Sequence, residues 1–125
     1  MGAVTRLCFD TNILIDALKG IPMAWDEVHS AGERLVSILT SIELLAGAND
    51  EDEERSARQL LRVFRVVPVD EAVAQHAVRI RRTKRLKLPD AIVYATALAE
   101  GCQLTTRDTK DFSEDDPIIR APYRL

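Results

Sequence analysis

Short runs of β-branched and apolar residues alternate along this chain with longer stretches that have the spacing of amphipathic helices. Strands are predicted over residues 3–9, 34–39, 64–69 and 103–106, with Ile118-Ile119 as a short fifth. Helices are predicted over residues 12–19, 22–30, 41–48, 51–61, 71–85 and 89–100. Because helical segments separate the strands, the strands are expected to pair in parallel. The pattern therefore predicts a three-layer α/β/α sandwich with a parallel four- or five-stranded sheet.

Length and composition place these elements in a single domain, residues 1–125. Apolar residues make up 46% and charged residues 30%, which is typical of a globular protein with its own core. The net charge of −3 excludes a globally basic nucleic-acid-binding protein, although local basic patches stay open. We find no apolar run as long as a membrane span and no signal-peptide pattern, so we expect a cytoplasmic protein without membrane contact.

Four acidic residues fall where the predicted topology puts the carboxyl ends of the strands. Asp10 directly follows the first strand, Glu43 lies in the first turn after the second, and Asp108 follows the fourth. Asp90 opens the apolar helix before the fourth strand, and Asp16 is expected as a polar helix position at the mouth of the site. Ligands gather at this edge of an open parallel sheet. Clustered carboxylates repel one another unless a cation lies among them, and oxygen ligands favour Mg²⁺ or Mn²⁺ over zinc.

Each of the four acids also has a structural interpretation. Asp10 could begin the turn before the first helix, and Asp108 could cap the turn after the fourth strand. Thr40 and Glu43 have the spacing of a capping box, and Asp90 suits the positive end of a helix dipole. What four separate caps do not explain is that all four acids fall at one end of the predicted sheet.

Three segments in this order resemble the PIN-domain family of metal-dependent ribonucleases, specifically the VapC-type toxins. The segments are CFDTNILIDALKG, SILTSIELLAGA and KLPDAIVYATALAEGCQLTTRDTKDF, which together extend from residue 8 to residue 112. The resemblance implies Mg²⁺- or Mn²⁺-dependent endonucleolytic cleavage of RNA by a homodimer that a cognate VapB-type antitoxin inhibits. It makes Asp10, Glu43, Asp90 and Asp108 the catalytic acids. The metal ligands would be Asp10, Asp90 and Asp108, with Asp111 as a less direct contributor.

An acidic site that cuts RNA needs basic groups nearby to hold the phosphates. Four residues at the end of the fifth helix are predicted to do so: Arg79, Arg82, Arg85 and Lys87. The alternative is a solvated helix face, in which case the arginines of the fourth helix become the better candidates. Ile21 and Trp25, apolar residues of a short helix, are predicted to form part of a groove for the antitoxin, with burial in the core as the alternative.

Other functional classes match the sequence less well. A receiver-like phospho-acceptor domain, the leading non-catalytic alternative, needs a second acid beside Asp10, but Phe9 and Thr11 flank it. In that reading Asp70 would have to be the phospho-acceptor. A haloacid-dehalogenase-like phosphatase needs Asp-x-Asp, and residue 12 is Asn. A binding module that retains the fold without catalysis is the third alternative, and metal-dependent RNA cleavage distinguishes it from the enzyme.

Overall fold

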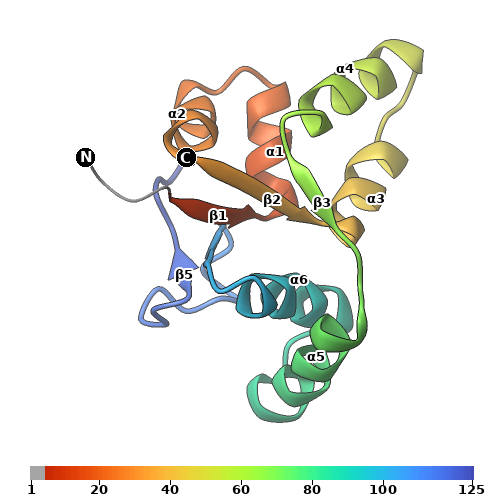
Figure 1. Cartoon of the computed structure of the whole chain (residues 1–125). Helices are drawn as coiled ribbons and strands as arrows, with labels where there is room; N and C mark the ends of the chain where they lie inside the picture. The colour runs from red at the N-terminus through yellow and green to blue at the C-terminus, as the bar shows by residue number, and fades with distance from the viewer. Residues whose placement is uncertain (1–4) are drawn as a thin grey trace.

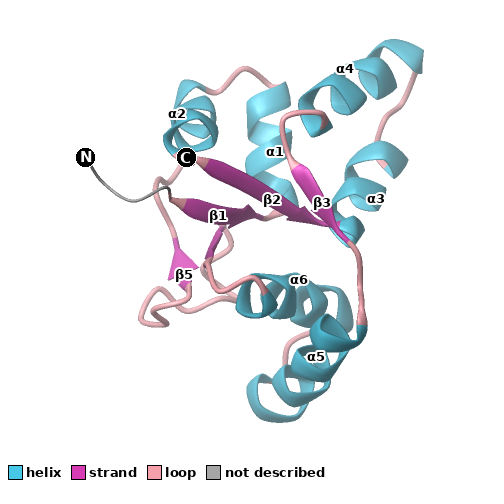
Figure 2. Cartoon of the chain, viewed as in Figure 1, coloured by secondary structure: helices cyan, strands magenta, loops and turns pink. Residues whose placement is uncertain are grey.

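The computed structural model describes residues 5–125, in which five strands form one parallel sheet with helices on both faces (Figures 1 and 2). The strands lie in the order β3-β2-β1-β4-β5, so the first strand is central. Their bounds are β1 (Arg6–Phe9), β2 (Glu33–Ser37), β3 (Arg65–Val67), β4 (Gln103–Thr105) and β5 (Ile119–Arg120). The predicted parallel sheet is confirmed, with five strands.

Six helices complete the sandwich. On one face lie α1 (Thr11–Leu18), α2 (Pro22–Ser30), α3 (Ile38–Ala46) and α4 (Glu51–Leu61), and on the other lie α5 (Glu71–Lys84) and α6 (Leu88–Ala99) (Figure 1). Successive β1 residues serve opposite cores, because side chains alternate along a strand. Leu7 and Phe9 pack with α1 to α4, whereas Cys8 packs with α5 and α6. No helix of the described residues is both long and apolar enough to span a bilayer.

The junction between β2 and α3 differs from the predicted one. The strand ends at Ser37 and the helix begins at Ile38, three residues before the expected start. Ser37 Oγ accepts a hydrogen bond from the Leu39 amide at 3.1 Å, which makes Ser37 the cap. The capping box of Thr40 and Glu43 is therefore wrong, and Glu43 lies in the second turn. The Ile38-Leu39 pair looked like strand because a buried helix start has the same apolar composition as a strand.

Other element ends shift by a few residues. Residues 3 and 4 of the predicted first strand lie outside the described residues, and β1 begins at Arg6. β3 ends before Pro68, which has no amide hydrogen to continue a ladder. β5 lies one residue later than predicted. α5 ends at Lys84 because Arg85 adopts the left-handed conformation, with φ of 55°.

Candidate active site

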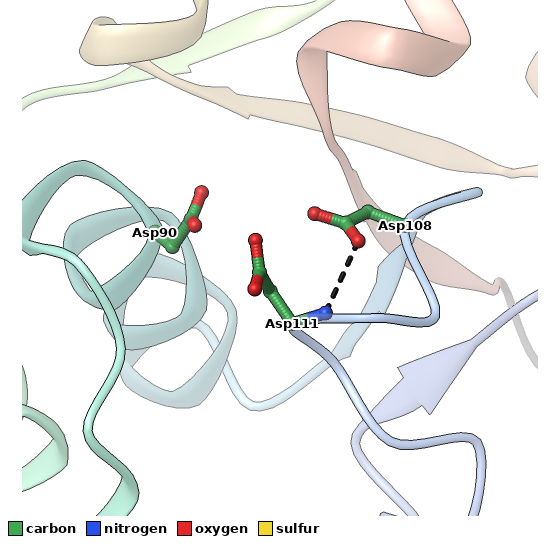
Figure 3. Close-up of side chains that lie close together, drawn as sticks. All are labelled: Asp90, Asp108 and Asp111. Atoms are coloured by element: carbon green, nitrogen blue, oxygen red, sulfur yellow. Dashed lines mark hydrogen bonds between the residues drawn. The ribbon is translucent and has the colours of Figure 1, made fainter.

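The carboxyl edge of the sheet brings together acids from segments that are distant in the chain. Asp10 follows β1, Asp108 and Asp111 lie in the loop after β4, and Asp90 lies in the first turn of α6. Asp90, Asp108 and Asp111 each offer one carboxylate oxygen, and these three oxygens all lie within 4.8 Å of one another. Figure 3 shows the three side chains directed toward a common space. We call these three residues the aspartate cluster.

The loop after β4 builds half of this cluster. Asp108 Oδ1 accepts hydrogen bonds from the amides of Lys110 and Asp111, both at 3.1 Å. Figure 3 shows the bond from the Asp111 amide. Asp108 therefore does cap the turn after β4, as the structural interpretation predicts. The same turn brings Asp111 beside Asp108, so capping and cluster formation occur together. Asp111 was predicted as a less direct contributor, and the geometry instead puts it inside the cluster.

Asp10 lies beside the aspartate cluster but is not one of its members. The residue is 8% exposed. Asp10 Oδ1 accepts from the Thr11 amide at 2.8 Å, so Asp10 is the N-cap of α1, and Oδ2 accepts from the Thr106 hydroxyl at 2.8 Å. The pKa of Asp10 is raised to about 6, chiefly by burial and also by the charges of Asp90 and Glu43, while these two hydrogen bonds act to lower it.

Glu43 is exposed on α3, where its carboxylate accepts a hydrogen bond from the Thr11 hydroxyl at 2.9 Å. Its charge raises the pKa of both Asp10 and Asp90. The structure thus brings Glu43 to the side of the site formed by α1. It has no capping role there, so its position next to the other acids needs a different explanation.

Mutual repulsion is evident at Asp90. Burial raises the pKa of this half-buried carboxyl, and the charges of Asp111, Asp108 and Glu43 raise it further, while Lys87 lowers it. A divalent cation would relieve this repulsion. The three oxygens all lie within 4.8 Å of one another, which is comparable with the roughly 4 Å between opposite oxygen ligands of one Mg²⁺ ion. A donor set of carboxylates alone fits a hard ion such as Mg²⁺ or Mn²⁺ better than zinc.

Sequence reasoning missed the polar side chains that connect these acids. The Thr106 hydroxyl donates to Asp10 and accepts from the Asp108 amide at 3.0 Å, so it joins Asp10 to the loop of the aspartate cluster. Asp16 was expected at the mouth of the site, and this is wrong, because its side chain is 1% exposed and pairs with Arg107 at 2.6 Å. The four-residue spacing of Asn12 and Asp16 is the one signal that could have indicated a shared partner.

The predicted RNA-binding residues occupy two different places. Arg85 and Lys87 lie in the connection between α5 and α6, and Lys87 is the N-cap residue of the helix that carries Asp90. Arg79 and Arg82 lie on α5 itself, and Arg82 lines a cavity between α5 and α6 with Val78 and Leu88. These four side chains form no ion pair within residues 5–125. Of the four, Lys87 is the residue whose charge lowers the pKa of Asp90.

Ile21 and Trp25 are half-buried rather than free. Both pack against the core beneath α1 and α2, and Trp25 Nε1 donates to the Ala17 carbonyl at 2.9 Å. A cavity of about 460 Å³ lies elsewhere, between α1, α3 and α4. Its lining includes exposed Ile15 and Leu18 and extends to Glu43, and it contains neither Ile21 nor Trp25.

Comparison with known proteins yields a consistent set of matches. The PIN domain family model matches residues 7–115. Ribonuclease VapC10 of Mycobacterium tuberculosis is 34% identical over 111 residues, which cover 82% of this chain and 83% of that protein. Ribonuclease VapC1 of Methanocaldococcus jannaschii is 25% identical over 113 residues, or 86% of this chain and 79% of that protein.

The solved structures give the same picture. A chain of a toxin–antitoxin complex from Klebsiella pneumoniae superimposes with a TM-score of 0.87 at 35% identity. The match covers 95% of this chain and 99% of that chain, so the two folds agree over essentially their whole length.

Proposed function

The chain belongs to the PIN-domain family, and we propose that it is a metal-dependent endoribonuclease, the toxin component of a VapBC-type toxin–antitoxin module. The observation that carries the proposal is the aspartate cluster at the carboxyl edge of the sheet. The relatives named as ribonucleases and the similar chain from a toxin–antitoxin complex support it. A receiver-like domain is not favoured, because Asp70 caps α5 through its bond to the Val73 amide.

We propose Mg²⁺ or Mn²⁺ as the cofactor, held by Asp90 and Asp108. Asp111 is close enough to complete the ligand set on one side. Asp10 is proposed on the other side, because Asp90 raises its pKa and the two charges therefore lie near each other. Glu43, also coupled to both, would act through a bound water.

The bound ion would supply an activated water and neutralise charge that develops on the phosphodiester. The residues of this chain hold that arrangement in place. Thr106 and the Thr11 amide orient Asp10, and the turn amides orient Asp108. Arg85 and Lys87 are proposed to hold phosphates of the RNA beside the site, because they lie in the connection that leads into Asp90.

For the antitoxin we propose the cavity between α1, α3 and α4 in addition to the predicted contacts at Ile21 and Trp25. Exposed Ile15 and Leu18 offer apolar area, and Glu43, Asp52 and Glu53 line the same cavity with negative charge. An antitoxin segment with apolar side chains and a basic residue directed at Glu43 fits this lining. Such a segment would block the site from one side. The homodimer stays a prediction.

The direct test is to incubate the purified, antitoxin-free protein with total cellular RNA, with and without Mg²⁺ or Mn²⁺, and to map the cut ends. We expect metal-dependent cuts that disappear in Asp10→Asn and Asp90→Asn. Asp115→Asn is the matched control, since Asp115 is an exposed acid of the C-terminal loop outside the cluster. Cleavage that persists in Asp90→Asn, or that is absent from the wild type with metal, would contradict the proposal and favour a non-catalytic binding module.

A further inference from the structure

A second hydrogen-bond network lies next to the acids and is centred on Asp16 of α1. Its buried carboxylate accepts from Arg107 Nε at 2.6 Å, from Arg107 Nη2 at 3.0 Å and from the Tyr123 hydroxyl at 2.7 Å. Burial by itself would raise the pKa of Asp16, but the hydrogen bonds from Arg107 and Tyr123 outweigh it and lower the pKa. Asp16 is therefore ionised, and its two carboxylate oxygens accept hydrogen bonds from Nε and Nη2 of Arg107.

Arg107 is held to α1 a second time through its backbone. The Arg107 amide donates to Asn12 Oδ1 at 3.0 Å. Asn12 and Asp16 are four residues apart and therefore lie on the same face of α1, one turn from each other. A single residue of the loop after β4 is thus anchored at two successive turns of the helix that follows Asp10.

The position of Arg107 in the chain gives this anchoring a consequence for the acids. Its neighbours are Thr106, whose hydroxyl donates to Asp10, and Asp108, whose amide donates back to that hydroxyl. Asn12 Nδ2 also donates to the Thr106 hydroxyl at 3.2 Å. Any shift of residue 107 along α1 would move Asp108 relative to Asp10.

We propose that Arg107, held by Asp16, which Tyr123 in turn orients, is a positioning residue that sets the separation of Asp108 from Asp10 and thereby the affinity of the site for its divalent ion. That the site binds a divalent metal ion rests on the proposed function. The hydrogen bonds that hold Arg107 do not depend on it. Residues that orient metal ligands by hydrogen bonds commonly change metal affinity or activity by about 10- to 100-fold when they are replaced. Arginine is required because its planar fork holds a carboxylate at two points, which a lysine ammonium does not reproduce.

The test compares Arg107→Lys with a matched control, Arg120→Lys. Lysine retains the positive charge beside buried Asp16, so the variant should fold. Arg120 forms the same kind of fork with Glu27 of α2, at 2.7 and 3.0 Å. Mn²⁺ affinity is measured by calorimetry at a temperature where circular dichroism shows each variant folded. We expect Arg107→Lys to bind Mn²⁺ about tenfold more weakly, Tyr123→Phe to lose less, and Arg120→Lys to match the wild type.

Two further readouts distinguish positioning from a general loss of stability. Hydrogen exchange at the amides of Asp108 and Asp111 should speed up in Arg107→Lys but not in Arg120→Lys. In RNA cleavage, kcat should fall with KM unchanged, because the RNA-binding surface is intact.

An unchanged Mn²⁺ affinity in folded Arg107→Lys, or an equal loss in Arg120→Lys, would overturn the inference. If the wild type binds Mn²⁺ and Arg107→Lys binds it more weakly, but neither cuts RNA, the inference stands and the ribonuclease proposal fails. A wild type that binds no Mn²⁺ overturns both.

Discussion

The carboxylate of Asp10 is almost completely buried, and this burial governs how the free energy of unfolding depends on pH. Its pKa is about 6 in the folded protein and ordinary, near 3.8, in the unfolded chain. Between these values the folded protein retains a proton that the unfolded chain has lost. The free energy of unfolding therefore falls as pH rises from about 4 to 6, and the loss persists above that range.

We predict that Asp10→Asn removes this dependence in the metal-free protein. Relative to the variant, the wild type should lose about 2–3 kcal/mol of unfolding free energy between pH 4 and pH 7. Urea unfolding in the presence of a chelator measures the difference, and Asp115→Asn serves as the control. If the free energy of unfolding depends on pH in the same way in the wild type and in Asp10→Asn, then folding does not raise the pKa of Asp10.

Glu43 allows a second prediction at this scale, because the structure leaves it without a capping role. In Glu43→Gln the amide oxygen can still accept from the Thr11 hydroxyl, so the free energy of unfolding should change by less than about 0.5 kcal/mol. Loss of the charge should weaken Mg²⁺ binding, so that the Mg²⁺ concentration at half-maximal cleavage rises about tenfold. Titration of cleavage with Mg²⁺ measures this, with Glu51→Gln on α4 as the control. An unchanged midpoint would mean that Glu43 is only a surface residue.

At the scale of elements, the connection between α5 and α6 joins a basic segment to the start of the helix that carries Asp90. Arg85 is in the left-handed conformation and Lys87 is the N-cap residue of α6, so both backbone positions are constrained. Their side chains are exposed. The other two candidates, Arg79 and Arg82, lie farther back along α5. These two pairs can therefore be tested against each other.

We predict that Arg85→Asn with Lys87→Ser weakens RNA binding more than Arg79→Ala with Arg82→Ala does. Asn tolerates the left-handed conformation and Ser is a good N-cap, so the first pair removes charge without backbone strain. The slope of log affinity against log salt should flatten by roughly one unit for each lost phosphate contact. Binding is measured in the Asp90→Asn background, where RNA stays intact. A larger effect of the Arg79 and Arg82 pair would indicate that RNA binds along α5 instead.

At the scale of the whole molecule, Glu43 connects the aspartate cluster to the cavity between α1, α3 and α4. Glu43 lines the cavity and is also coupled to Asp10 and Asp90. A partner seated in the cavity would therefore change the electrostatics of the site as well as cover it.

We predict that the protein restricts growth when it is expressed alone, and that Leu18→Glu escapes neutralisation by a co-expressed antitoxin. The substitution adds charge at a 39% exposed apolar residue of the cavity. Met23→Glu on α2, at a 43% exposed residue outside the cavity, is the control and should be neutralised like the wild type. Neutralisation of Leu18→Glu would argue against the cavity. A change in Trp25 fluorescence on antitoxin binding would favour the predicted Ile21 and Trp25 groove instead.

Local pattern determined the order of strands and helices and the parallel sheet, because the periodicity of apolar residues is a property of short segments. It also indicated Asp10, Asp90 and Asp108 at one edge, since strand direction fixes which ends of a parallel sheet meet. The local pattern did not predict the start of α3 correctly. Ser37 caps a helix only because β2 stops there, and the buried Ile38-Leu39 pair suits either element.

Tertiary packing alone decided which acids meet and which are buried. Asp111 joins Asp90 because the turn capped by Asp108 folds toward the start of α6, a contact between segments 21 residues apart. Asp16 is buried and ionised because Arg107 and Tyr123, 91 and 107 residues further along the chain, converge on it. Such pairings depend on where distant backbone segments lie. The four-residue spacing of Asn12 and Asp16 can indicate that the two share a partner, but it does not identify Arg107 as that partner.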